Sequence, residues 1–203
     1  LFIVLSHESF ANSNAQQILG NWIIDIDTSD DSEKLLKGKL RKSYQPEKIN
    51  KKHPTSRPKA GGATIESYWK TIRQSQERKA SKNFRRLGTA FLILTCEKIN
   101  ITKDVKYLGH MLISYDRSPN RRIKPNSQGR VFSAKGDELT HSYFGHTLAY
   151  FQNNVLILET DAPDGGKYLE KISLENNTLS YQIILKSLVL KEPVTVKRVF
   201  NRM

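Results

Sequence analysis

The chain has 203 residues, of which 26% are charged and 37% hydrophobic, and its formal net charge is +13. This length suits one domain, or one domain with an insertion, and the composition excludes a wholly disordered chain. No apolar run approaches the length of a transmembrane helix. The single cysteine, Cys96, excludes an internal disulfide and a multi-cysteine metal site.

The positive charge is concentrated in one segment. Residues 34–86 contain 17 Lys and Arg against three acids, a net charge of +14, so the rest of the chain sums to about −1. This asymmetry favours an anionic contact for that segment, such as a lipid headgroup or a polyanion.

Residues 1–15, LFIVLSHESFANSNA, resemble the end of a signal peptide. An apolar run is followed by two small-x-small cleavage patterns, which end at Ala11 and Ala15. We therefore predict a signal-peptide remnant and flexible N-terminus over 1–15, a single β-barrel domain over 16–203, and an extracytoplasmic location, periplasmic or secreted. The alternative is that 1–5 form a short β-strand of the domain.

The next elements are a strand, a basic loop and a helix. NWIIDIDTSD, 21–30, alternates as a half-buried strand does. The Lys-rich stretch that follows contains three prolines and predicts an irregular loop. Apolar residues then recur at helical spacing over 64–87, which predicts a basic amphipathic helix. Its anion-contact candidates are Lys70, Arg73, Arg78, Lys79, Lys82, Arg85 and Arg86. The alternative is a solvated basic face without a partner.

From about residue 89 onward, short apolar runs alternate with turn sequences such as QNN, APDGG and ENN. Their spacing of roughly ten residues predicts an antiparallel meander. About eight such strands close into an up-and-down barrel or fold as a sandwich. The predicted fold class is therefore mainly β, an antiparallel up-and-down barrel with a basic loop and helix, 34–86, inserted after the first strand.

Gly20-x-Trp22 before this meander resembles the lipocalin superfamily, and bacterial secreted lipocalin-like proteins of unassigned function in particular. QGRVF, NNVLILETDAPDGGKYLEKISLENNTLSY and VTVKRVFNR carry the rest of the likeness, which covers about 18–30 and 128–202. The resemblance implies that Trp22 closes the barrel floor and that Arg198 or Arg202 packs across its ring, with Gly20 allowing close approach.

Inward aromatic and aliphatic side chains of such a barrel line a ligand cavity or simply fill a small barrel. Alternation selects a set of cavity candidates, of which Tyr143 joins only if Gly145 marks a bulge. The candidates are Tyr143, Leu148, Tyr150, Leu156, Leu158, Tyr168, Leu179, Tyr181 and Ile183.

The sequence offers little evidence for a metal site, a phosphate site or a catalytic site. His141 and His146 are five apart, so a single regular strand places them on opposite faces and disfavours a shared zinc site. DAPDGG, 161–166, is typical of a hairpin turn rather than a phosphate loop, because a strand follows it. Its acids lack the spacing of a calcium loop. No catalytic constellation stands out, so we expect no enzyme, no metal and no cofactor.

The sequence leaves two functional hypotheses, with an enzyme third. The first is a non-catalytic extracytoplasmic barrel that binds a small apolar ligand or an anionic lipid. The second is a basic interaction module in which 34–86 contacts a polyanion or a partner surface. A peripheral anionic membrane is a candidate partner for that segment, and nucleic acid is less favoured because no nucleic-acid motif accompanies the charge.

Overall fold

A computed structural model describes residues 17–41, 87–116, 118–133, 135–136 and 138–203. These residues form ten strands and two helices, and the strands make one antiparallel sheet. The elements are β1 (Gly20–Ile24), α2 (Ser32–Lys37), α4 (Thr89–Thr95), β2 (Lys98–Lys103), β3 (Met111–Tyr115), β4 (Arg121–Ile123), β5 (Leu139–Ser142), β6 (Gly145–Gln152), β7 (Val155–Asp161), β8 (Lys167–Glu175), β9 (Thr178–Lys186) and β10 (Val194–Arg202).

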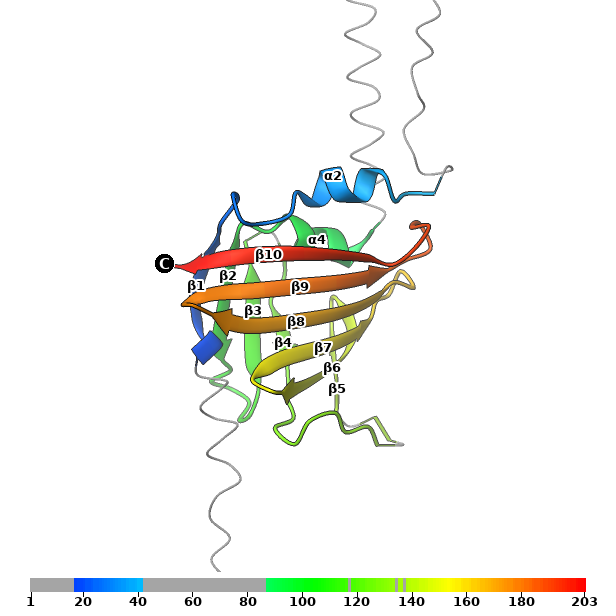
Figure 1. Cartoon of the computed structure of the whole chain (residues 1–203). Helices are drawn as coiled ribbons and strands as arrows, with labels where there is room; N and C mark the ends of the chain where they lie inside the picture. The colour runs from blue at the N-terminus through cyan, green and yellow to red at the C-terminus, as the bar shows by residue number, and fades with distance from the viewer. Residues whose placement is uncertain (1–16, 42–86, 117, 134, 137) are drawn as a thin grey trace, which may run out of the picture.

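The strands follow one another around a nearly closed barrel. Their order is β4-β3-β2-β1-β10-β9-β8-β7-β6-β5, so the first and last strands of the chain are neighbours. The gap between β4 and β5 narrows where Asn126, just after β4, pairs in parallel with Tyr150 of β6. Figure 1 shows the long strands β6 to β10 in front and β1 to β4 crossing behind them. The predicted up-and-down, lipocalin-like barrel is confirmed.

Two-residue turns set the register of the hairpins. Asn153 and Asn154 join β6 to β7, and Asn176 and Asn177 join β8 to β9; all four have positive φ between 49° and 65°. Asparagine tolerates this left-handed conformation, and two such residues make the turn that matches strand twist. The register then follows without a bulge, with Gln152 opposite Val155.

One end of the barrel is closed by Trp22. Its ring is fully buried, and its indole N–H donates to the Ile18 carbonyl at 3.0 Å. The Arg202 guanidinium lies over the ring, 4.5 Å from its centroid, and donates to the backbone of 17 and 19. Gly20, at φ 141°, leaves room for that guanidinium, since a Cβ there would lie 3.1 Å from it. Gly20, Trp22 and Arg202 therefore pack together where the first and last strands meet.

Arg198 lies elsewhere, at the helix-covered end. It donates to the carbonyls of Leu94 and Cys96 at the C-terminus of α4, and to the Ser32 hydroxyl of α2. A cation suits unpaired carbonyls at a helix end. The alternative in which Arg198 covers Trp22 is therefore corrected: Arg198 fastens both helices to β10, beside which α2 is drawn in Figure 1.

Several predictions lie outside the described residues. They are the signal-peptide remnant and flexible N-terminus at 1–15, with the extracytoplasmic location inferred from them, and the amphipathic helix together with its seven anion-contact candidates. They stay predictions. Within the described part of the chain, no helix is long and apolar enough to span a membrane.

Gly20→Ala tests the closure at Trp22. We expect it to lower the free energy of unfolding by about 1–3 kcal/mol, because a Cβ brings both an unfavourable φ and a close contact with Arg202. Gly38→Ala is the matched control, since Gly38 has helical φ and open space around its Cβ position. Equal urea midpoints for Gly20→Ala and the unmodified chain would contradict this account.

Candidate functional site

The barrel interior holds a buried ion pair. Nη1 of Arg121, in β4, donates hydrogen bonds to both carboxylate oxygens of Glu170, in β8, at 3.0 and 2.6 Å. Neither side chain has accessible surface. The other Nη of Arg121 donates to the Thr147 and Thr160 hydroxyls. Tyr181 donates to Glu170 at 3.2 Å. The pair thus joins the two layers of strands through the middle of the barrel.

Aromatic side chains surround this pair. The Tyr115 and Tyr181 hydroxyls are 3.2 Å apart, and the Arg121 guanidinium lies 5.4 Å from the centre of the Phe144 ring. Burial raises the pKa of both tyrosines, with Glu170 adding to the effect. Burial likewise raises the pKa of Tyr168 to about 12. These phenols therefore stay neutral at physiological pH and act as hydrogen-bonding groups.

The interior is packed around the ion pair. Leu156, Leu158 and Phe144 have no accessible surface, and Tyr181 and Ile183 have 1%. A side chain without accessible surface borders neither solvent nor an internal void that would hold water. The described side chains around Arg121 therefore fill the barrel instead of lining a ligand cavity there.

The predicted cavity set divides between two faces. Leu156, Leu158, Tyr168, Leu179, Tyr181 and Ile183 all belong to the main interior cluster. Leu148 and Tyr150 pack instead with Ile157 in a separate cluster on the outer face. The prediction that they share the interior is wrong, because the two-residue turn after β6 pairs Tyr150 with Ile157 and Leu148 with Glu159.

The predicted positions of Tyr143, His141 and His146 are also wrong, because the structure has a hairpin where the sequence predicted one strand. The stretch predicted as one strand is a hairpin, in which Ser142 pairs with Gly145 around a turn made by Tyr143 and Phe144. Tyr143 is therefore 59% exposed at the turn, without the bulge that was considered for it. His141 and His146 stand directly opposite each other on one face.

The outer wall of β5 to β9 carries two parallel rows of side chains. The register aligns neighbouring residues from strand to strand, so each row crosses five strands, about 19 Å at ordinary strand spacing. The middle row consists of Leu139, Leu148, Glu159, Leu169 and Ile184. The edge row, one pleat closer to the barrel end, consists of His141, His146, Asp161, Lys167 and Lys186.

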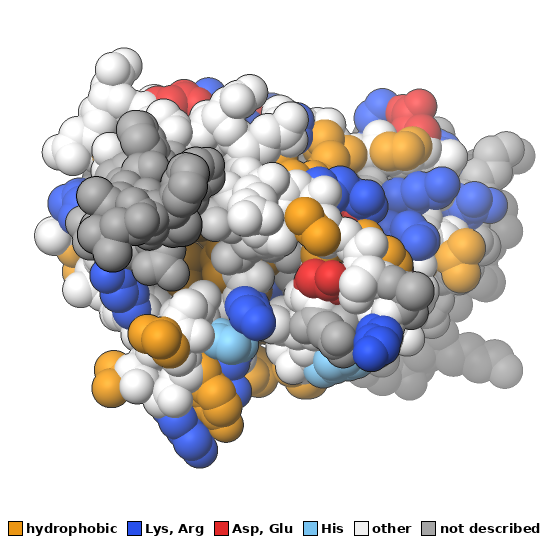
Figure 2. Space-filling view, turned by 90° about the horizontal axis from the view of Figure 1, so that it is seen from below, with side chains coloured by type: hydrophobic (Ala, Val, Ile, Leu, Met, Phe, Trp, Pro, Cys, Tyr) orange, Lys and Arg blue, Asp and Glu red, His pale blue; other side chains and the backbone are white. Residues whose placement is uncertain are grey.

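Members of these rows line a groove of about 550 Å³, which we call the outer-wall groove. Arg130 and Phe132, from the connection between β4 and β5, lie over one part of it, and Pro193 lines another. Phe132 is 60% exposed. Figure 2 shows Lys and Arg side chains next to hydrophobic ones toward the right of the view from below. The groove therefore combines an apolar row with a polar one.

The single acid of the middle row is neutralised within the protein. Arg130 donates to both carboxylate oxygens of Glu159, at 2.8 and 3.0 Å, and the Tyr150 hydroxyl donates at 2.9 Å. These bonds hold the pKa of Glu159 below its usual value. The same contacts fasten the connection that carries Phe132 against the wall.

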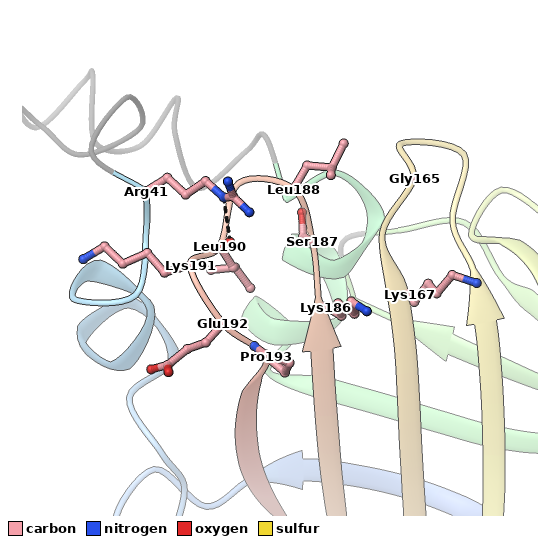
Figure 3. Close-up of a pocket in the computed structure, with 10 residues that line it drawn as sticks. All are labelled: Arg41, Gly165, Lys167, Lys186, Ser187, Leu188, Leu190, Lys191, Glu192 and Pro193. Carbon is pink, nitrogen blue, oxygen red and sulfur yellow. Dashed lines mark hydrogen bonds between the residues drawn. The ribbon is translucent and has the colours of Figure 1, made fainter.

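A second concavity lies at the adjoining end of the barrel. This rim cup of about 190 Å³ is formed mainly by the β9–β10 connection, with Arg41 and Gly165 across from it. Arg41 donates to the Leu190 carbonyl at 3.0 Å, as Figure 3 shows. Arg41, Lys191, Lys167 and Lys186 are its cations, against one acid, Glu192, which pairs with Lys39.

The outer-wall groove and the rim cup share Lys167, Lys186 and Pro193. The two lysines are directly opposite each other in the register. Like charges in this position repel, and Lys167 forms an ion pair with Asp161 at 3.0 Å. An apolar trough therefore runs into a region of positive charge. The sequence did not predict this arrangement, although the two-residue turn at Asn153 and Asn154 determines that Leu148 points to the outer face of the barrel.

Within the described residues, no group of three or more His, Cys, Asp or Glu side chains stands ready to hold a metal ion. Cys96 is buried and donates to the Ile93 carbonyl at 3.1 Å. Asp161 ends β7, and Asp164 lies in the β7–β8 turn, in which Gly165 has φ 78°.

The sequence matches no family model and no curated protein. Solved structures with a similar fold include apo lipid binding protein 8 of Caenorhabditis elegans, with 15% identity and TM-score 0.42 over 93% of this chain and 96% of that one. Fatty-acid-binding protein 1 of Echinococcus granulosus shows 12% identity and TM-score 0.43 over 93% and 98%. A secretory abundant heat soluble protein of Ramazzottius varieornatus shows 11% and 0.43 over 92% and 96%.

Breaking the interior ion pair tests the packed core. We expect Arg121→Met to lower the free energy of unfolding by about 3–5 kcal/mol, because it leaves the Glu170 carboxylate buried without a cation. Replacing both, as Arg121→Met with Glu170→Leu, should restore most of that loss. Denaturant unfolding of the two single variants and the double variant measures the cycle. Additive losses in the double variant would contradict a coupled pair.

Proposed function

We propose that this chain is a non-catalytic binding protein for a single-chain amphiphile with an anionic head, and that the ligand lies on the outer wall of the barrel. The observation that carries this proposal is the continuity of the outer-wall groove with the cationic rim cup through Lys167 and Lys186. The packed interior supports the same choice, because the described side chains around Arg121 have little or no accessible surface.

The apolar part of the ligand is accounted for by the middle row. Leu139, Leu169 and Ile184 present partly exposed apolar surface along this row, and the buried Leu148 lies between Leu139 and Glu159 at its floor. Its one charge, Glu159, is already paired. An extended chain laid along this row removes apolar surface from water on both partners, which is favourable by about 25 cal/mol for each Å².

The anionic head is accounted for by the shared lysines. A carboxylate or phosphate between Lys167 and Lys186 relieves their mutual repulsion and gains charge-assisted hydrogen bonds. Arg41 and Lys191 in the rim cup add positive potential behind them. The ligand is therefore oriented with its tail along the outer wall and its head at the rim.

Calorimetric titration with dodecanoate below its micelle concentration tests this function. We expect Lys186→Gln to weaken binding about threefold or more, because it removes one head-group contact. Ile184→Thr should also weaken binding by reducing the apolar surface of the middle row. Lys171→Gln is the matched control, a lysine of β8 that does not line the groove.

Dodecyl maltoside, a neutral amphiphile of nearly the same chain length, should bind more weakly than dodecanoate. Equal effects of Lys186→Gln and Lys171→Gln, or no preference for the anionic head, would contradict the proposed site.

As a second candidate, we propose that the basic segment 34–86 docks on an anionic membrane. Its attachment points support this: Arg41 contacts the β9–β10 connection, and Gly88 adjoins Asp164 of the β7–β8 turn. Arg41 and Gly88, which stand on either side of 42–86, therefore both lie at the end of the barrel that carries the rim cup. A membrane contact there would also bring a lipid head close to the shared lysines.

Vesicle sedimentation tests the membrane contact. We expect binding to phosphatidylglycerol vesicles that falls steeply as salt rises, since exposed charges are screened within about 10 Å at 0.1 M. Vesicles of phosphatidylcholine alone serve as the control. Unchanged affinity between low and high salt would contradict this candidate.

A further inference from the structure

The edge row begins with two histidines in contact. His141 of β5 and His146 of β6 are directly opposite in the register, and their ring centroids lie 4.2 Å apart at an interplanar angle of 71°. Both residues are exposed. Their Cβ atoms belong to a directly opposed cross-strand pair, for which separations are about 4.5–5.5 Å. The short hairpin turn keeps the two backbones in this arrangement.

A carboxylate continues the same row. Asp161 of β7 is the register partner of His146, on the side away from His141. It is 67% exposed and forms an ion pair with Lys167 at 3.0 Å. An exposed ion pair of this kind is worth little, so its carboxylate exchanges partners at small cost. Rotation of Asp161 toward His146 places two imidazoles and one carboxylate on one face of three adjacent strands.

We propose that His141 and His146 bind a late first-row divalent metal ion, of which Zn²⁺ is the representative, and that Asp161 joins as a third ligand. Imidazole nitrogen suits zinc, copper and nickel, whereas magnesium and calcium prefer sites made of oxygen. As they lie, the three side chains do not form a metal site; the two histidines are the preformed pair, and Asp161 completes the site when it leaves Lys167. Water fills the remaining position, since the residues are exposed.

The site adjoins the proposed ligand groove, and one consequence rests on the proposed function. His146 and Asp161 line the outer-wall groove together with Lys167. A bound metal ion adds positive charge to the edge row, and it frees Lys167 from Asp161. Both changes favour an anionic head at the shared lysines. Zinc should therefore strengthen dodecanoate binding by the unmodified chain.

Isothermal titration of the full chain with Zn²⁺, without amphiphile, tests the metal site itself. We expect His141→Ala and His146→Ala each to weaken binding about tenfold or more, and Asp161→Asn to weaken it less. His110→Ala is the matched control, a histidine that lies beside Tyr107 in the β2–β3 hairpin. Mg²⁺ should not compete for the site. All four side chains are at least partly exposed, and circular dichroism establishes that each variant is folded.

The result that would overturn the proposal is Zn²⁺ binding that neither His141→Ala nor His146→Ala weakens more than His110→Ala does. Because no amphiphile is present, this outcome is separate from failure of the proposed function. Zinc that binds at the two histidines without changing dodecanoate affinity would retain the metal site and remove only the coupling between them.

Discussion

The ion pair between Arg121 and Glu170 is the constraint on which the rest of the barrel depends. Two charges without accessible surface lose their hydration. The attraction between them offsets this free-energy cost only if their geometry is good and their other hydrogen bonds are satisfied. Thr147 and Thr160 accept bonds from Nη2 of Arg121, and Tyr181 donates to the carboxylate. Arg121 Nε has no hydrogen-bond partner among the described residues, and aromatic side chains close around the pair. A water-filled cavity in the same place would compete with this network. The polar side chains described in the interior are thus bonded to one another, which supports the proposal of a ligand site on the outer wall.

The outer wall acquires its site from the register of the strands. In an antiparallel sheet joined by two-residue turns, residues of like position align across every strand, so a few apolar side chains become a continuous row. Here one row is apolar apart from Glu159, and the neighbouring row is polar and cationic. This gives an amphipathic groove at the edge of a cationic rim, on the outside of a barrel whose described interior side chains are packed together. The connection that carries Arg130 and Phe132 adds one wall, because the Arg130–Glu159 pair fastens it there.

Much of the fold could be predicted from the sequence, because the signals are local. Alternating apolar residues and Asn-Asn turns predict a meander, and the resemblance to lipocalins pairs the first strand with the last. The face on which Leu148 and Tyr150 lie could also be predicted, because a two-residue turn places even-numbered residues of β6 opposite odd-numbered residues of β7. The turn at Tyr143 and Phe144 was harder, because aromatic residues are typical of strands rather than turns.

The buried network and the groove could not be predicted in the same way. Arg121 and Glu170 are far apart in the chain, and each has the appearance of an ordinary surface charge until the barrel places them face to face. RVFSA, 130–134, has the composition of a strand, yet Arg130 to Ser133 form no strand in the structure and lie in the connection over the outer wall. Tertiary contacts override local propensity in such segments. The pairing of Lys167 with Lys186 likewise depends on register across β8 and β9.

The central claim is that the ligand binds outside a filled barrel. A methyl-labelled sample titrated with dodecanoate tests it most directly by nuclear magnetic resonance, because adjacent residues of one strand point to opposite faces. The account predicts that the methyl signals of Leu148, Leu169 and Ile184 shift, while those of the inward Leu158, Ile172 and Ile183 stay in place. Shifts confined to the inward methyl groups would place the ligand inside the barrel and contradict the account.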